Sequence, residues 1–155
     1  MEALPEVDVN YNQNKTNEIT YALQKLNTVG VVVLPGAIDR ELCRQVVLDY
    51  QDYCLKHAAY VEENRDVLGR EKLLVNFHLY SDAAMRVGTN EQTMKIVDAF
   101  FGSKTSVYTS LMFKYGTQQP VHRDTPHFAT WPQNQFVGVW TALEDIDQNK
   151  NEKIN

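Results

Sequence analysis

The stretch TSVYTSLMFKYG, residues 105–116, marks the point where the sequence changes from helical to strand-like patterning. It is rich in β-branched and aromatic residues, which favour strands, and QFVGVWTALEDID, residues 135–147, has the same character. Upstream, apolar residues recur at helical spacing. An order of helices followed by strands is typical of α+β domains, so we expect helices that flank one side of an antiparallel sheet.

Three helices are predicted before this change of pattern. Their expected boundaries are N-caps at Asn17, Asp39 and Thr89 or Asn90, with ends at Gly30, about Tyr60 and Gly102. Apolar residues at helical spacing are expected to face inward. In the second helix these are Leu42, Cys43, Val46, Val47, Tyr50, Cys54 and Leu55, and in the third helix Met94, Val97, Phe100 and Phe101.

Two shorter apolar segments lie between these helices. VVVLP, residues 31–35, is short and β-branched, which predicts a buried strand closed by Pro35. KLLVNFHLY, residues 72–80, fits either a strand or an irregular buried segment. The expected organisation is a loose lead-in over residues 1–16, a folded part over residues 17–147 and a disordered tail over residues 148–155.

Composition excludes some classes of partner. The chain of 155 residues has a net charge of -5 and a pI of about 5.3, which argues against a surface for nucleic acid or for an anionic membrane. Its N-terminus, MEALPEVDVN, has no signal-peptide pattern, and no apolar run is long enough to span a bilayer. Cys43 and Cys54 lie three turns apart on one predicted helix, beyond disulfide reach. We therefore expect a cytoplasmic protein with reduced cysteines.

The segment QQPVHRDTPHFATWP, residues 118–132, contains the pattern His-x-Asp at His122 and Asp124. In an extended chain, residues two positions apart point to the same face, so the imidazole and the carboxylate would converge on one point. Such a nitrogen and oxygen pair suits a divalent metal, including the Fe(II) of oxygenases that use two His and one carboxylate. The pattern by itself also fits a surface loop with a His–Asp hydrogen bond.

Three blocks of the sequence resemble one family in order and spacing. GVVVLPGAIDRELC, SLMFKYGTQQPVHRDTPHFATWP and VGVWTALEDID are similar to segments of the phytanoyl-CoA dioxygenase-like proteins. The resemblance covers Gly30 to Asp147. It implies a double-stranded β-helix, that is, a jelly roll of cupin-like type, and a dioxygenase that uses Fe(II) and the cosubstrate 2-oxoglutarate to hydroxylate small molecules or acyl thioesters.

The resemblance also implies roles for single residues. His122 matches the family's first iron-binding His, and Asp124 matches its iron-binding carboxylate. Trp140 matches a position that lines the 2-oxoglutarate side of the pocket, and Glu144 lies on the same strand. Ser110, on the preceding strand, is near a position that can touch 2-oxoglutarate. No catalytic residue beyond the metal ligands is implied.

The sequence departs from the family pattern after Asp124. The family's third metal ligand is a second His, followed by an Arg that pairs with 2-oxoglutarate, whereas this sequence then contains one His, His127, and no arginine. A jelly roll also needs about eight strands, and the sequence predicts three or four. We therefore expect the N-terminal part of such an enzyme, truncated before the second metal His and the 2-oxoglutarate Arg, and catalytically incomplete alone.

Two alternatives stay open at this stage. The chain can be a non-catalytic interaction module whose open sheet edge pairs with a partner or, as a homodimer, with a second copy. Alternatively, His127 or a second chain can complete the metal site. These hypotheses differ in whether iron binds and in whether its binding survives loss of His127.

Several other residues fit both a functional and a structural role. His78 fits the mouth of a pocket or a hydrogen-bonded buried position, and Lys114 fits a contact to an acidic cosubstrate or a solvated strand end. Trp131 and Phe128 fit a pocket wall or loop packing. The acidic cluster at residues 144–147 fits a second metal site or, more simply, a solvated strand end.

Overall fold

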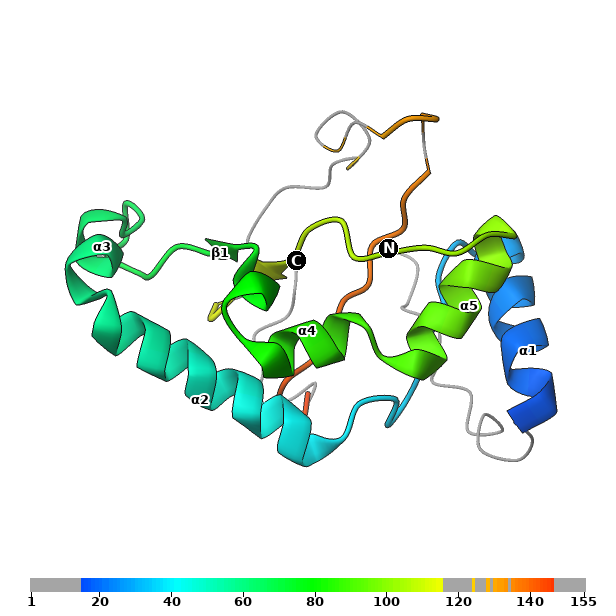
Figure 1. Ribbon diagram of the computed structural model, residues 1–155, viewed down its shortest axis with the longest axis horizontal. Coiled ribbons are helices and arrows are strands. Elements are labelled where there is room, and N and C mark those ends of the chain that lie inside the picture. The colour runs from blue at the N-terminus through cyan, green and yellow to red at the C-terminus, as the bar shows by residue number, and fades with distance from the viewer. Residues whose placement is uncertain (1–14, 116–123, 125–127, 129, 134, 147–155) are drawn as a thin grey trace. The chain divides into compact units, whose positions relative to one another are not determined.

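The computed structural model of the chain describes residues 15–115, 124, 128, 130–133 and 135–146. They belong to two compact units, which are described separately. The first unit comprises residues 1–37 and 89–106, and the second comprises residues 38–88 and 107–155. Figure 1 shows the elements of both units. The predicted lead-in and tail lie almost wholly outside the described residues.

The first unit is a pair of helices, α1 (Lys15–Thr28) and α5 (Glu91–Phe101), that lie against each other (Figure 1). The predicted end of α1 is confirmed, because Gly30 has a left-handed φ of 83° and its N–H donates to the Lys25 carbonyl at 3.2 Å. The predicted N-cap Asn17 is wrong. The helix begins two residues earlier, at Lys15, because Lys15 and Thr16 continue it beyond the apolar pattern.

Both predicted ends of α5 are confirmed. The Asn90 side chain caps the helix by accepting the Thr93 N–H at 3.1 Å, and Gly102 ends it with a φ of 65°. The predicted inward face is rotated by about one position. Thr93 and Ile96 are buried, whereas Phe100 is 37% exposed. Each residue turns about 100° around a helix, so packing against α1 can select the neighbouring stripe.

Residues 31–34 do not form the predicted strand. Their exposure alternates as it would in a strand, with Val31 and Val33 exposed by 46% and 51%, and with Val32 and Leu34 half-buried. Across the part of the chain that the structure describes, no other segment forms a ladder with them. Extended patterning without a partner therefore gives an extended loop, which Pro35 ends as predicted.

Asp98, in the last turn of α5, is hydrogen-bonded to residues that follow the helix. Its carboxylate accepts hydrogen bonds from the Lys104 ammonium at 2.8 Å, the Thr105 hydroxyl at 2.7 Å and the Thr105 N–H at 2.8 Å. These donors, Lys104 first, lower the pKa of Asp98 to about 2. The pKa of Asp98 in the folded state lies below the ordinary value of 3.8, so the ionised carboxylate stabilises the fold above pH 4. This contribution to folding stability is lost as the pH falls toward 2.

An NMR titration of the side-chain carboxyl carbon is therefore expected to give Asp98 a pKa of about 2. In the Lys104→Ala variant the pKa should rise toward its ordinary value, and added salt should have the same direction of effect because Lys104 is exposed. A Lys95→Ala variant, which removes an ammonium that pairs with Glu91 instead, should leave the Asp98 pKa unchanged. A wild-type value near 3.8 would contradict the contacts described here.

The second unit is organised around α2 (Arg40–Lys56). The predicted cap is confirmed, since Asp39 Oδ1 accepts the N–H groups of Glu41 and Leu42 at 2.9 and 3.2 Å. The helix ends at Lys56 rather than at Tyr60, because His57 leaves the helical conformation at φ -116° and ψ 34° and a separate helix, α3 (Ala58–Glu63), follows.

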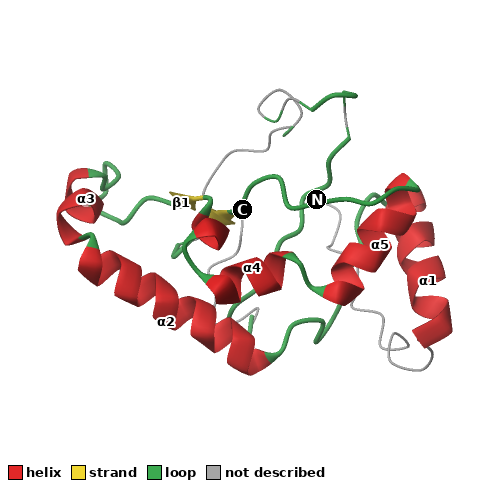
Figure 2. Cartoon of the chain, viewed as in Figure 1, coloured by secondary structure: helices red, strands yellow, loops and turns green. Residues whose placement is uncertain are grey.

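A small antiparallel sheet and two short helices complete the second unit (Figure 2). The strands β1 (Leu74–Val75) and β2 (Leu111–Met112) pair with Leu74 opposite Met112 and Val75 opposite Leu111. After β1 the chain forms the short 3-10 helix η2 (Phe77–Leu79) and then α4 (Asp82–Gly88), a helix that the sequence pattern did not predict. Both α2 and η2 pack against α4.

The core of the second unit consists of the buried side chains of Val46, Tyr50, Phe77 and Ala83. Half-buried apolar residues surround these four, including Leu74 of β1, Met112 of β2 and Leu143. The predicted inward face of α2 is confirmed at Val46 and Tyr50 but is wrong at Leu55, which is 79% exposed. Leu55 lies in the last turn of α2, where Tyr53 and Cys54 pack against the core and Leu55 does not.

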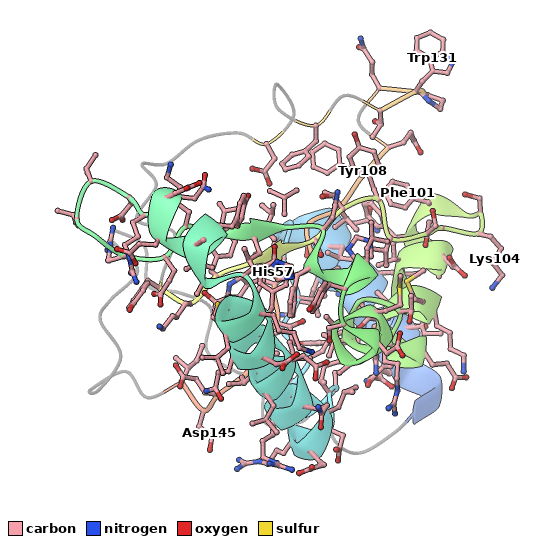
Figure 3. All side chains as sticks on the ribbon, turned by 60° about the vertical axis from the view of Figure 1, so that its left-hand side comes forward. His57, Phe101, Lys104, Tyr108, Trp131 and Asp145 are labelled. Carbon is pink, nitrogen blue, oxygen red and sulfur yellow. The ribbon has the colours of Figure 1, made fainter. Side chains whose placement is uncertain are left out.

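Residues 135–146 form no strand, although their composition favours one. They run as extended chain whose later part lies along the start of α2. Leu143 packs on the core, and the Ala142 carbonyl is 4.0 Å from the Cys43 sulfur. Asp145, which is labelled in Figure 3, pairs with Arg40 at 2.9 Å. Both charged side chains of this pair are mostly exposed, so it contributes little stability.

The predicted fold class is therefore confirmed only in its coarse part. The described residues form a mixed, helix-rich structure with one two-stranded antiparallel sheet, and within them a jelly roll is not seen. Neither residues 31–34 nor residues 135–146 add a strand to this sheet. None of the helices in the described ranges combines the length and the apolar content that crossing a membrane requires.

Candidate functional site

The His-x-Asp segment lies partly within the described structure. Asp124 is exposed and sits in a bend, and its carbonyl accepts the Phe128 N–H at 3.1 Å. His122 and His127 lie outside the described residues, so the expected convergence of His122 and Asp124 stays a prediction. Within the described residues, no group of three or more His, Cys, Asp and Glu side chains is placed to hold a metal ion.

Ser110 directly precedes β2 and is the predicted cosubstrate residue with the most defined surroundings. Its carbonyl accepts the Asn76 N–H at 2.7 Å, which extends the ladder by one bond beyond Val75 and Leu111. Its hydroxyl lies 2.6 Å from Nδ1 of His78 and 3.2 Å from the His78 backbone nitrogen. The turn that follows β1 therefore holds both the backbone carbonyl and the side-chain hydroxyl of Ser110.

His78 is the buried, hydrogen-bonded histidine that the sequence allowed as one of two roles. Only 7% of its surface is exposed, and it lies in η2 beside the core residue Phe77. Its ring nitrogen Nδ1 meets the Ser110 hydroxyl, so the buried imidazole has a polar partner. The other role, at the mouth of a pocket, is not what this environment shows.

Trp140 and Glu144 are described but are not enclosed. Trp140 is 64% exposed, and Glu144 is also exposed, both on the extended chain of residues 135–146. Trp131 is 92% exposed and projects from its loop in Figure 3, whereas Phe128 packs on Phe136 with ring centroids 5.7 Å apart. Loop packing therefore holds for Phe128, and no described residue encloses Trp131.

Lys114 is engaged by a carboxylate within the second unit. Its ammonium donates to Glu71 at 2.8 Å, and this contact lowers the pKa of Glu71 and raises the pKa of Lys114. Lys114 also lies 5.4 Å from the centre of the Tyr115 ring. The interpretation of Lys114 as a purely solvated strand-end residue is therefore incomplete, because it ties β2 to the segment before β1.

A small cavity beside this ion pair is lined by residues that include Tyr50, Cys54, Glu71 and Lys72. Burial, and then the hydrogen bond with Cys54, raise the pKa of the Tyr50 hydroxyl. The cavity holds about 80 Å³, well below the roughly 300–1,000 Å³ typical of ligand pockets, so it does not accommodate a cosubstrate.

The sequence did not predict the link between Ser110 and the turn at Asn76. Asn76 adopts a left-handed conformation at φ 59°, which ends β1 and turns the chain into η2. An Asn between two apolar runs is a usual signal for that conformation, because its short polar side chain tolerates it. The signal was available in NFHLY, but the pairing partner at Ser110 was not, because 32 residues separate Ser110 from His78.

Comparison with known proteins gives a family assignment. The chain matches the family described as phytanoyl-CoA dioxygenase (PhyH) over residues 26–151. No curated protein and no solved structure matches it significantly. The matched range contains the His-x-Asp segment, both strands of the sheet and Trp140, and it spans most of the chain. The chain therefore belongs to the phytanoyl-CoA dioxygenase family, a family of Fe(II)- and 2-oxoglutarate-type dioxygenases.

Proposed function

We propose that the chain functions as an Fe(II)/2-oxoglutarate-dependent hydroxylase whose substrate is a small molecule or an acyl thioester. The observation that carries this proposal is the family match over residues 26–151, which includes His122, Asp124 and Trp140 in one continuous range. The acidic net charge and the scattered basic residues agree with a small-molecule substrate rather than with nucleic acid.

The donor set of the His-x-Asp segment fits the proposed metal in chemical type. An imidazole nitrogen from His122 and a carboxylate oxygen from Asp124 are two of the three ligands that Fe(II) oxygenases use. Asp124 is an exposed residue of the described structure. When bound, iron with 2-oxoglutarate supplies the oxidising chemistry, which no protein side chain provides. We assign no residue to the third ligand position.

The side chains of the protein would bind the metal and orient 2-oxoglutarate. In this proposal His122 and Asp124 hold the metal, Ser110 donates a hydrogen bond to a carboxylate of 2-oxoglutarate, and Trp140 covers one side of the cosubstrate. Ser110 is held by β2 and by the turn at Asn76, which gives its hydroxyl a defined position. Trp140 is 64% exposed, which leaves its indole surface available for contact with a ligand.

Binding measurements test this proposal without requiring turnover. Under anaerobic conditions, calorimetry should show that 2-oxoglutarate binds in the presence of Fe(II) and much more weakly without it. Glutarate is the matched control, because it has both carboxylates but lacks the 2-oxo group that chelates a metal. Equal binding of glutarate and 2-oxoglutarate, or no dependence on iron, would contradict the proposal and favour the non-catalytic interaction module.

A further inference from the structure

The turn at residues 76–78 is hydrogen-bonded to Ser110 through both its backbone and its hydroxyl. Asn76 is left-handed, and three hydrogen bonds join the turn to residues 109 and 110 besides the ring contact of His78. They are Asn76 N–H to the Ser110 carbonyl at 2.7 Å, the Thr109 hydroxyl to the Asn76 side-chain oxygen at 2.7 Å, and His78 N–H to the Ser110 hydroxyl at 3.2 Å.

The fourth contact joins two side chains that can each donate or accept. His78 Nδ1 lies 2.6 Å from Ser110 Oγ, and His78 is 7% exposed, so bulk water competes little for this bond. A serine hydroxyl has one proton and two lone pairs. One lone pair already accepts the His78 N–H, so the state of Nδ1 decides what the hydroxyl can still offer to a ligand.

Two arrangements follow from the position of the imidazole proton. If Nδ1 carries a proton, the ring donates to Ser110, both lone pairs are used, and the hydroxyl proton is left to donate outward. If only Nε2 carries a proton, Nδ1 accepts the Ser110 proton, and the hydroxyl offers only a lone pair outward. A carboxylate accepts hydrogen bonds and cannot donate, so only the first arrangement suits it.

We propose that His78 is a positioning residue that orients the Ser110 hydroxyl to donate to a carboxylate of 2-oxoglutarate. This inference rests on the proposed function. It makes the buried ring more than a packing group, because binding of the cosubstrate selects the form of His78 with a proton on Nδ1. His78 itself touches Ser110 and not the cosubstrate.

The affinity for 2-oxoglutarate, measured by anaerobic calorimetry with Fe(II), tests whether His78 and Ser110 act together in binding it. Ser110→Ala is expected to weaken binding about ten-fold or more, as for loss of a hydrogen bond to a charged group. His78→Leu should weaken it to a similar extent, whereas His78→Asn, which keeps an amide at the place of Nδ1, should stay close to wild type. The double variant Ser110→Ala/His78→Leu should be no weaker than Ser110→Ala, because the two residues act through one bond.

A spectroscopic measurement supports the same test in the unaltered protein. Nitrogen NMR of the His78 ring should show a protonated Nδ1 once 2-oxoglutarate is bound, and Ser110→Ala should shift the Nδ1 resonance in the free protein. An unprotonated Nδ1 in the complex overturns the inference even if His78→Leu does not fold. Wild-type affinity in folded His78→Leu overturns it while leaving the proposed function intact, and wild-type affinity in folded Ser110→Ala overturns it together with the cosubstrate contact proposed for Ser110. Absence of 2-oxoglutarate binding to the wild type overturns both.

Discussion

Replacing Phe77 with alanine is expected to lower the free energy of unfolding by about 3–5 kcal/mol, the usual cost of removing a buried phenylalanine. Phe77 is 3% exposed and is one of four buried residues at the centre of the second unit. Its ring meets those of Tyr50 and Tyr53 edge-on at 6.1 and 6.0 Å and stacks on Tyr80 at 6.1 Å. The substitution would remove all three ring contacts and leave a cavity between α2 and η2.

Urea denaturation followed by circular dichroism measures this loss. Leu79→Ala is the matched control, because Leu79 belongs to the same short helix but is 73% exposed, and its effect should stay within about 0.5 kcal/mol. The free energy of unfolding of domains of this size is only about 5–15 kcal/mol, so Phe77→Ala should remove a large fraction of it. Similar effects of the two substitutions would show that the cluster around Phe77 is not the core.

Removing either proposed metal ligand is expected to lower Fe(II) affinity by about 100-fold or more. Loss of groups that merely support a ligand already costs about 10–100-fold, and loss of a ligand itself should exceed that. The relevant variants are His122→Ala and Asp124→Ala, compared with the wild type by iron titration under anaerobic conditions. Both expected losses of affinity rest on the proposed function, in which His122 and Asp124 hold the metal.

Two controls sharpen the iron measurement. Asp145→Ala removes an exposed carboxylate that pairs with Arg40, and it should leave iron binding unchanged. His127→Ala should also leave it unchanged if no third ligand comes from that position. A loss of affinity in His127→Ala would instead assign His127 to the metal, and unchanged affinity in Asp124→Ala would remove the His-x-Asp site from consideration.

The helices of this protein could be predicted largely from local sequence. Asp39 and Asn90 cap helices because a short polar side chain reaches the first free N–H groups, and Gly102 ends a helix because it adopts a positive φ without strain. These are properties of a few neighbouring residues. The missed helix α4 is only seven residues long, too short for a clear apolar period.

The strands could not be predicted in the same way, because a strand needs a partner. Residues 31–34 have the composition and the alternating exposure of a strand but form no ladder within the described structure. Leu74 and Val75 do form one, because Met112 and Leu111 lie opposite them. Composition reports the tendency to be extended and does not report which segments meet. The same limit applies to the candidate site, where His-x-Asp is visible in sequence but the bond from His78 to Ser110 is not.

The contact between residues 142–145 and the first turn of α2 has a consequence for the order of folding. Arg40 and Asp145 are separated by 105 positions, so this contact closes a much longer loop than any local turn, although the pairing of β1 with β2 and the packing of α2 on α4 shorten the connection. Contacts of such long separation form slowly. During synthesis, the side of α2 at Arg40 and Cys43 therefore gains its contacts with residues 142–145 only after those residues have been made, later than its contacts with α4.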